Sequence, residues 1–193
     1  MRRVAAGVLL VAALLAPSAA RSLDIGHTRL PEWLRLGPDG AELVLNGAGL
    51  RSRLRFEIYV IGLYLPERRH TDESVLAQAG AKRVRIVMLR DVSAKQMTEA
   101  LVGVMQKNNP PAELAAARGG IEEFRALLLS IPRVPTGTVF DIDYLPASGT
   151  RLAVDGIPKG APIPGAAFYR AVLRIWIGDK PEQPGLKDAL LGG

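Results

Sequence analysis

The order of strand-like and helix-like patterns constrains the fold of this chain more than any other feature. Residues 53–60 alternate apolar and polar side chains, as strands with two unlike faces do, and Val84, Ile86 and Met88 fall on one face of a second strand over 83–89. From Ser93 to about Leu128 apolar residues instead recur at helical spacing, and the alternation returns over 138–155 before one more apolar helix. Grouped strands and grouped helices predict an α+β fold with antiparallel pairing rather than alternating βαβ units.

The first group of strands surrounds a glycine-rich segment. Glu42–Asn46 is predicted to be a short strand, and Gly47–Gly49 a turn that leads into a long strand over Arg53–Leu65. Pro66 ends that strand, because proline cannot donate a hydrogen bond to a neighbouring strand. The segment before Glu42 is predicted to be a loop.

The remaining segments are predicted from their periodicity, their caps and their glycine and proline residues. Gly119-Gly120 predicts a weak point or a break in the second long helix, because glycine disfavours helix interiors. The loop predicted over 158–164 precedes the last apolar helix. The expected elements are a helix over 72–79, a strand over 83–89, a helix from the N-cap Ser93 to about Asn108, a helix from Pro111 to about Leu128, strands over 138–144 and 150–155 joined as a hairpin, a helix ending at Gly178, and a final helical turn over 186–191.

The first 20 residues have the pattern of a cleaved secretory signal. Arg2 and Arg3 precede an apolar run over 4–15, and the small residues of 17–20 suit signal peptidase. The apolar run is shorter than the roughly 20 residues that span a bilayer, which favours cleavage over a membrane anchor. We therefore expect one domain over 21–193, in a bacterial periplasm and without a stable membrane anchor.

Composition excludes several classes of function. The chain has no cysteine, which rules out a disulfide, a thiolate nucleophile and a cysteine-ligated metal. His27 and His70 are isolated, and no metal or cofactor is expected. Loss of Arg2 and Arg3 would lower the net charge from +6 to +4, and with only 5% aromatic residues no nucleic-acid surface is indicated. We expect a monomer with a basic surface, weakly attracted to anionic lipid headgroups at most.

Two acidic residues share one face of a predicted strand. Asp141 and Asp143 alternate with apolar neighbours over 138–144. Paired carboxylates can serve acid–base catalysis. Exposure to solvent explains this pair with fewer assumptions, and we expect the two side chains to be exposed.

Three segments, in order, resemble the chalcone isomerase family. Gly47–Arg51, before the aromatic strand ending at Leu65, matches the G-A-G-x-R that precedes the central strand of that family. Lys95-Gln96 stands where the plant enzymes have G-K-Q-Y, and 168–187 is similar to the C-terminal signature of the bacterial chalcone isomerase-like group. The resemblance covers most of residues 21–193. It implies an open-faced β-sandwich, with a curved antiparallel sheet packed against a layer of helices.

The resemblance implies an anchor for a small anion or phenol. Arg51 matches the family's arginine, whose guanidinium can hold a carboxylate or phenolate through two parallel hydrogen bonds. Tyr59 stands where the plant enzymes have threonine, and some fatty-acid-binding members pair an arginine with a tyrosine. Without the resemblance, Arg51 is an ordinary cation at a strand edge and Tyr59 a core aromatic. On one straight strand they would lie about 27 Å apart, so sharing a ligand requires a bend or a bulge.

The resemblance also implies that the plant catalytic residues are missing. Met97, Ala100 and Val104 stand where the plant enzymes have tyrosine, lysine and asparagine. Each replacement removes a group that could hydrogen bond to a phenolate, a ketone or water. Met97, Leu101 and Val104 share one helix face, which could form an apolar wall for an acyl chain or simply pack the core.

These observations lead to one principal hypothesis and two alternatives. The principal one is a non-catalytic periplasmic protein that binds a small amphipathic anion, fatty acid or phenolic, through Arg51, Tyr59, Met97, Leu101 and Val104. The first alternative is an intramolecular lyase or isomerase acting on an enolisable ketone of the chalcone type. The second is an interaction protein with a vestigial pocket. An open cavity that reaches Arg51 beneath the helix over 93–108 would favour binding.

Overall fold

The computed structural model describes residues 21–37, 40–181 and 183–193. The predicted signal sequence, residues 1–20, lies outside the described residues. Within those residues, no helix has the length and apolar character needed to cross a membrane.

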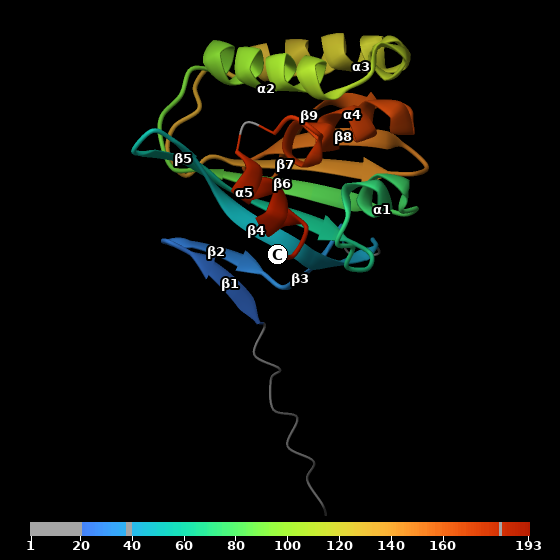
Figure 1. The fold of residues 1–193 in the computed structure, drawn as a ribbon. Coiled ribbons are helices and arrows are strands. Elements are labelled where there is room, and N and C mark those ends of the chain that lie inside the picture. Colours follow the sequence, from blue (N-terminus) through green and yellow to red (C-terminus); the bar gives the residue numbers. More distant parts are fainter. Residues whose placement is uncertain (1–20, 38–39, 182) are drawn as a thin grey trace, which may run out of the picture.

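A curled sheet of seven antiparallel strands organises the fold, in the spatial order β3-β4-β5-β6-β7-β8-β9 (Figure 1). A separate hairpin, β1-β2, lies beside it. The strands are β1 (Ser22–Ile25), β2 (Thr28–Pro31), β3 (Trp33–Arg35), β4 (Glu42–Arg53), β5 (Phe56–Leu65), β6 (Lys82–Met88), β7 (Val139–Leu145), β8 (Gly149–Val154) and β9 (Ile157–Ile163). The helices are α1 (Asp72–Ala77), α2 (Ala94–Asn108), α3 (Pro111–Leu129), α4 (Ala166–Ile177) and α5 (Pro184–Leu190). The α+β prediction is confirmed.

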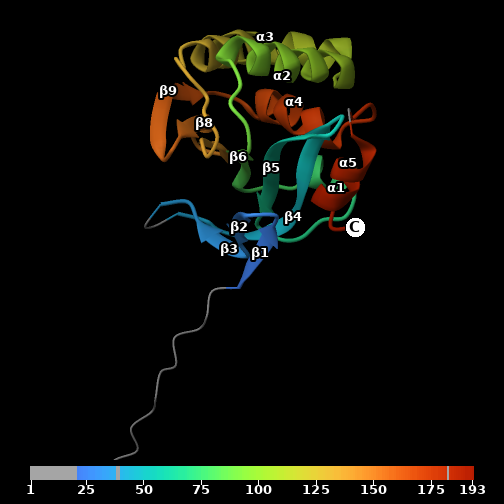
Figure 2. The same cartoon turned by 90° about the vertical axis from the view of Figure 1, so that its left-hand side faces the viewer.

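The helices cover one face of the sheet in two tiers (Figure 2). Helix α4 lies next to the sheet, and α2 and α3 pack side by side over α4. The main core lies between the sheet and these helices, and it joins buried side chains of β5, β6, β7 and β8 to those of α2, α3 and α4. A smaller apolar cluster, which includes Leu30, Leu43 and Tyr64, lies on the outer face beneath the β1-β2 hairpin.

The glycine-rich segment is not a turn but the middle of β4. The chain reverses instead at Leu54-Arg55, so the predicted long strand over Arg53–Leu65 is wrong at its start. The glycines are needed because α5 packs directly on β4. A Cβ atom at Gly47 would lie 2.1 Å from the carbonyl oxygen of Ala189, and one at Gly49 would lie 2.6 Å from Leu186 Cδ1.

Two other groups of predictions differ from the structure. The loops predicted before Glu42 and over 158–164 contain β1, β2, β3 and β9. Helix α3 runs unbroken through Gly119-Gly120, because packing outweighs the weak helix propensity of glycine. A Cβ atom at Gly120 would lie 2.8 Å from Phe168 Cγ, so the missing side chain lets α4 approach α3. The N-cap prediction at Ser93 is confirmed by its hydrogen bond from the Gln96 amide.

The prediction that Asp141 and Asp143 are exposed is wrong, since their exposed fractions are 6% and 7%. Each stands directly opposite an arginine of β6 and forms a two-pronged ion pair. Arg83 Nε and Nη2 lie 2.6 and 2.7 Å from the Asp143 oxygens, and Arg85 makes the same pattern with Asp141 at 2.7 Å. These hydrogen bonds raise the pKa of Arg85 and compensate for burial of its partner.

Candidate functional site

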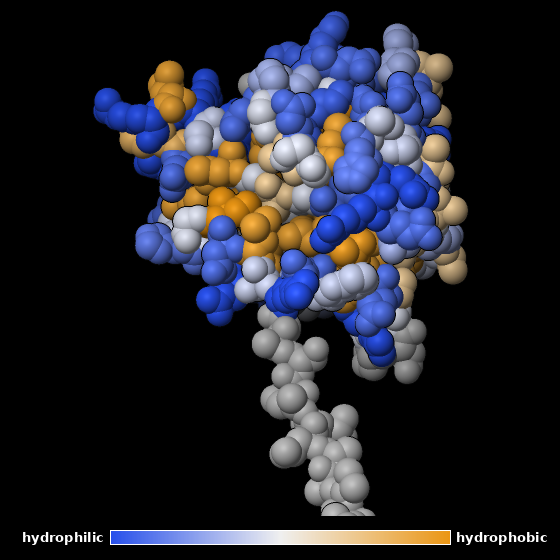
Figure 3. Space-filling model, turned by 60° about the horizontal axis from the view of Figure 1, so that its bottom comes forward, coloured by the Kyte–Doolittle hydropathy of each residue, from blue (hydrophilic) through white to orange (hydrophobic). Residues whose placement is uncertain are grey.

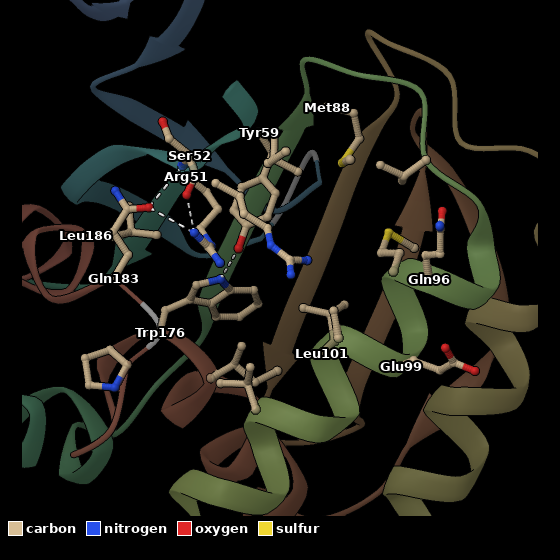
Figure 4. A pocket seen from close by; sticks show the side chains of 18 of the residues that line it. Arg51, Ser52, Tyr59, Met88, Gln96, Glu99, Leu101, Trp176, Gln183 and Leu186 are labelled. Atoms are coloured by element: carbon tan, nitrogen blue, oxygen red, sulfur yellow. Dashed lines mark hydrogen bonds between the residues drawn. The ribbon is translucent and has the colours of Figure 1, made fainter. Parts of the chain in front are cut away.

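A cavity of about 870 Å³ lies between the β4-β5 end of the sheet and helix α2 (Figure 4). Its size is within the range of about 300–1,000 Å³ that is typical of small-molecule sites. Residues from β4, β5, α2 and α4 and from the segment leading into α5 form its walls. The lining residues include Arg51, Ser52, Ile58, Tyr59, Met88, Gln96, Met97, Ala100, Leu101, Val104, Ile175, Trp176, Gln183 and Leu186.

Arg51 and Tyr59 are direct partners across the β4-β5 hairpin. The expected bend lies at Leu54-Arg55, where the chain reverses completely, so the separation of about 27 Å expected on a straight strand does not arise. Residues directly opposite on antiparallel strands have Cβ atoms about 5 Å apart and point to the same face. The Arg51 guanidinium and the Tyr59 hydroxyl therefore lie on the same side of the cavity (Figure 4).

Trp176 of α4 fixes the position of the tyrosine. Its indole Nε1 donates a hydrogen bond of 2.9 Å to the Tyr59 hydroxyl oxygen, and the tryptophan is almost completely buried. The sequence pattern placed Trp176 only in the apolar helix ending at Gly178 and did not assign it to the site. A buried indole N–H needs an acceptor, and that requirement was the signal that could have found this contact.

Gln183 holds the arginine and closes an open edge of β4. Strand β3 pairs with β4 only over its first residues, 42–44, so the far end of that edge needs other partners. The Gln183 amide supplies them, because Nε2 donates to the Leu50 carbonyl at 2.9 Å and Oε1 accepts from the Ser52 amide at 3.0 Å. The same Oε1 accepts from Arg51 Nη1 at 3.2 Å, and Arg51 also donates to the Ser52 carbonyl. No local pattern in the sequence indicates this role.

Helix α2 supplies the apolar wall opposite these polar groups. Met97, Leu101 and Val104, the three predicted residues of one helix face, all line the cavity. Leu101 and Val104 are buried and also contribute to the main core, while Met97 is half-buried at its margin. The two hypotheses for that helix face, an apolar cavity wall and packing in the core, therefore apply to the same side chains.

The cavity combines the Arg51 guanidinium, the Tyr59 phenol and a largely apolar interior, with the charged side chains of Arg53 and Glu99 also on its lining. All five predicted site residues lie on its walls, and sequence reasoning missed Trp176, Gln183, Met88 and Ile58. Within the described residues, histidine and acidic side chains form no cluster of three or more that could hold a metal ion. A guanidinium beside a phenol can bind a carboxylate or phenolate, and the apolar walls can surround the rest of such a molecule.

Comparisons with known proteins agree with this architecture. The fold is similar to the crystal structure of a fatty-acid binding protein of Arabidopsis thaliana, with a TM-score of 0.64 and 15% sequence identity. The likeness covers 89% of this chain and 96% of that one. Among curated proteins, none matches the chain by sequence. The model of the chalcone isomerase-like family matches residues 22–192, and the chain belongs to this family.

Proposed function

We propose that this protein binds a small amphipathic anion, such as a fatty acid, and does not transform it. One observation carries the proposal: Arg51 and Tyr59, neighbours across β4 and β5, line the same cavity as the apolar face of α2. The carboxylate contacts the guanidinium and the phenol, and the acyl chain lies against Met97, Leu101 and Val104. The structural likeness to a protein described as fatty-acid binding supports this choice of ligand.

The polar groups around Arg51 suit an anion. Gln183 Oε1 and the Ser52 carbonyl accept hydrogen bonds from the guanidinium and orient it without adding a formal charge of their own. The Tyr59 hydroxyl oxygen accepts a hydrogen bond from Trp176, and a phenol hydroxyl is a group that can donate to a carboxylate. A charge-assisted hydrogen bond contributes about 1.5–3 kcal/mol, so the anchor is expected to decide which headgroup is preferred.

The wall of α2 argues against the isomerase alternative. Met97, Ala100 and Val104, where the plant enzymes have hydrogen-bonding groups, line the cavity as apolar side chains. They can neither orient water nor stabilise a developing oxyanion. We expect no turnover of chalcone-type substrates above the uncatalysed rate, which absorbance of the chalcone would reveal.

The test compares a fatty acid with the fatty alcohol of the same chain length by isothermal titration calorimetry. The wild type should prefer the acid by at least about tenfold, since only the acid carries a charge for Arg51. Arg51→Gln should weaken acid binding by about 10–100-fold, leave alcohol binding nearly unchanged and so abolish the preference. Tyr59→Phe should weaken acid binding by at least about tenfold, since the hydrogen bond from the phenol to the carboxylate is charge-assisted.

A matched control separates this effect from a general loss of positive charge. Arg118 lies exposed on α3, outside the cavity lining, so Arg118→Gln should bind both ligands like the wild type. Native mass spectrometry of gently purified protein should also reveal a bound amphipathic anion. Equal binding of acid and alcohol by the wild type, or no binding of either, would contradict the proposal.

The same proposal includes a periplasmic location. It is supported by the basic, apolar and small-residue segments of residues 1–20. Intact mass of protein recovered from the producing bacterium should correspond to a chain that begins at or close to Arg21. A mass that includes Met1–Ala20 would contradict processing.

A further inference from the structure

The turn between β4 and β5 projects beyond the sheet and exposes apolar side chains at its tip. Leu54 is 92% exposed and Phe56 is 40% exposed. The turn extends at the left of Figure 1, and in Figure 3 the projection at the upper left carries an apolar side chain among strongly hydrophilic ones. Exposed apolar residues on a projecting turn gain nothing from the interior of their own chain.

Arginines surround these apolar side chains. Arg53 and Arg55 are exposed on the same turn, and Arg90 joins them from the end of β6. The guanidinium carbon of Arg90 lies 4.3 Å from the centre of the Phe56 ring, and that of Arg55 lies 5.2 Å from it. We define the tip as Arg53–Phe56 together with Arg90.

Two acids lie near the tip without cancelling its charge. Glu57 follows directly in β5, and Asp91 follows Arg90. Asp91 Oδ1 accepts hydrogen bonds from the amide and hydroxyl of Thr136, at 2.7 and 3.0 Å, which direct that carboxylate towards another loop. The tip itself contains three arginines and no acid, so it is complementary to an anionic surface.

The backbone at Leu54 gives independent support. Its φ angle is +56°, in the left-handed region that glycine and asparagine adopt with less strain than leucine. A large apolar side chain thus stands where the backbone favours a small or polar one, and it is almost fully exposed. The tight reversal between β4 and β5 accounts for the backbone angle, whereas a contact outside the molecule would account for the exposed leucine side chain at that position.

The tip also borders the mouth of the cavity. Ser52, Arg53 and Leu54 line it together with Gln96 and Met97 of α2. We propose that the tip docks on a membrane surface that contains anionic lipid. Leu54 and Phe56 enter the headgroup region, the three arginines contact lipid phosphates, and the mouth of the cavity faces the bilayer. Docking depends on the tip alone and not on which ligand occupies the cavity.

The test measures sedimentation with vesicles of phosphatidylcholine, alone or mixed with phosphatidylglycerol. All variants are compared in the same processed form, as judged by intact mass. The wild type should bind the mixed vesicles, and added salt should weaken binding because it screens exposed charges. Arg55→Glu/Arg90→Glu should reduce the partition coefficient at least about twenty-fold, since each cation near an anionic surface contributes about fivefold.

Leu54→Asn separates docking from folding. It should reduce vesicle binding about tenfold through loss of apolar area, yet leave stability to urea unchanged or higher, because asparagine tolerates the left-handed backbone. The matched controls are Arg118→Glu/Arg125→Glu on α3 and Ile157→Asn, which make the same kinds of change at exposed positions away from the tip. Both controls should sediment like the wild type.

Three outcomes would overturn docking: no sedimentation of the wild type, equal binding to pure phosphatidylcholine, or equal losses in the controls. If the wild type does not sediment with vesicles, a protein partner remains as the molecule that contacts the tip. Arg55 and Arg90 do not line the cavity. Titration of their double variant with fatty acid, without vesicles, therefore tests ligand binding separately, and it should match the wild type even where docking is lost.

Discussion

The two ends of the inner sheet face lie under the same layer of helices but are filled differently. Beneath α3, aromatic rings fill the space: Phe124 and Phe168 have centroids 5.5 Å apart, and the Tyr144 and Tyr169 rings stack at 5.2 Å. Beneath α2, Met97 and Leu101 face Tyr59 across a cavity of about 870 Å³. A helix layer over a curled sheet therefore does not by itself create or exclude a cavity.

The difference lies in the side chains and in what holds them. At the filled end, packing of the rings predominates, and the Tyr169 hydroxyl also donates a hydrogen bond of 3.3 Å to the Ile142 carbonyl oxygen. At the hollow end, hydrogen bonds fix the positions of the walls. Trp176 of α4 donates to Tyr59 of β5, and Gln183 at the start of α5 donates to β4. This contrast predicts that substitutions at the filled end change stability, while those at the hollow end change ligand binding.

The largest expected effect is loss of a ring at the filled end. Phe168 is buried against Phe124, and Phe168→Ala should lower the free energy of unfolding by about 3–5 kcal/mol, because the space cannot collapse fully. Met97→Ala at the hollow end should cost less than about 1 kcal/mol, since its half-buried side chain already borders a cavity. Urea unfolding measures the free energy of unfolding of both variants. Similar decreases in the two would contradict the proposed difference between the filled and the hollow end.

A glycine of β4 gives the next effect. In Gly47→Ala the new Cβ atom would lie 2.1 Å from the Ala189 carbonyl oxygen, so α5 must move away from β4. Overpacking of this kind costs about 1–3 kcal/mol, and displacement of α5 should also weaken ligand binding. Gly119→Ala on α3 has open space around the new atom and should be neutral or stabilising by up to about 1 kcal/mol. Equal stability of the two variants would refute the proposed role of Gly47.

These glycines show which parts of the fold could be predicted from the sequence and which could not. The helices and most inner strands follow from periodicity, since Ser93 begins α2 and the 138–155 segment forms a hairpin as predicted. Gly47–Gly49 instead favours a turn when only neighbouring residues are considered. The helix that explains the glycines lies about 140 residues later, so only the tertiary fold shows that they belong to a strand.

The residues of the site also fall into two groups: those that a local sequence pattern indicates and those that only the tertiary fold reveals. Arg51, Tyr59 and the face of α2 were found because a motif and a helical period point to them. The reversal at Leu54-Arg55, which makes the first two direct partners, lacks glycine, proline or asparagine, and no local pattern predicts it. Gln183 contacts β4 from more than 130 residues away.

A smaller effect should appear at Gln183, on ligand binding rather than on folding. Gln183→Glu keeps an oxygen close to the Ser52 amide and Arg51 Nη1, but it loses the donor to the Leu50 carbonyl oxygen and adds a negative charge beside the anchor. We expect fatty acid to bind about tenfold more weakly through repulsion in a partly buried site, with alcohol binding changed far less. Glu99→Gln, at the opposite rim, provides a control in which a charge is removed. Equal weakening of acid and alcohol would assign Gln183 a purely structural role.

The smallest effect concerns the ion pair that ties α5 to α1. Lys187 Nζ lies 2.8 Å from Asp72 Oδ2, and this hydrogen bond lowers the pKa of Asp72 below its ordinary value. A lowered carboxyl pKa adds stability above the unfolded pKa of about 3.9, and that stability is lost as pH falls through the folded value. Asp72→Asn should therefore cost less than about 1 kcal/mol near pH 7, because the pair is partly exposed, and almost nothing once the pH has fallen below the lowered folded pKa of Asp72.

The control for this pair is Glu73→Gln, which changes a second acid in the first turn of α1. Within the described residues Glu73 forms no ion pair, so its substitution measures the effect of a charge at the helix start alone. A pH-dependent difference in unfolding free energy that is larger for Asp72 than for Glu73 would assign the excess to Lys187. Because α5 forms a wall of the cavity through Leu186, acid should weaken binding of the fatty alcohol, whose charge does not change with pH, before it unfolds the aromatic end. If ligand binding and the folded structure of the aromatic end are lost over the same pH range, the two ends behave as one cooperative unit.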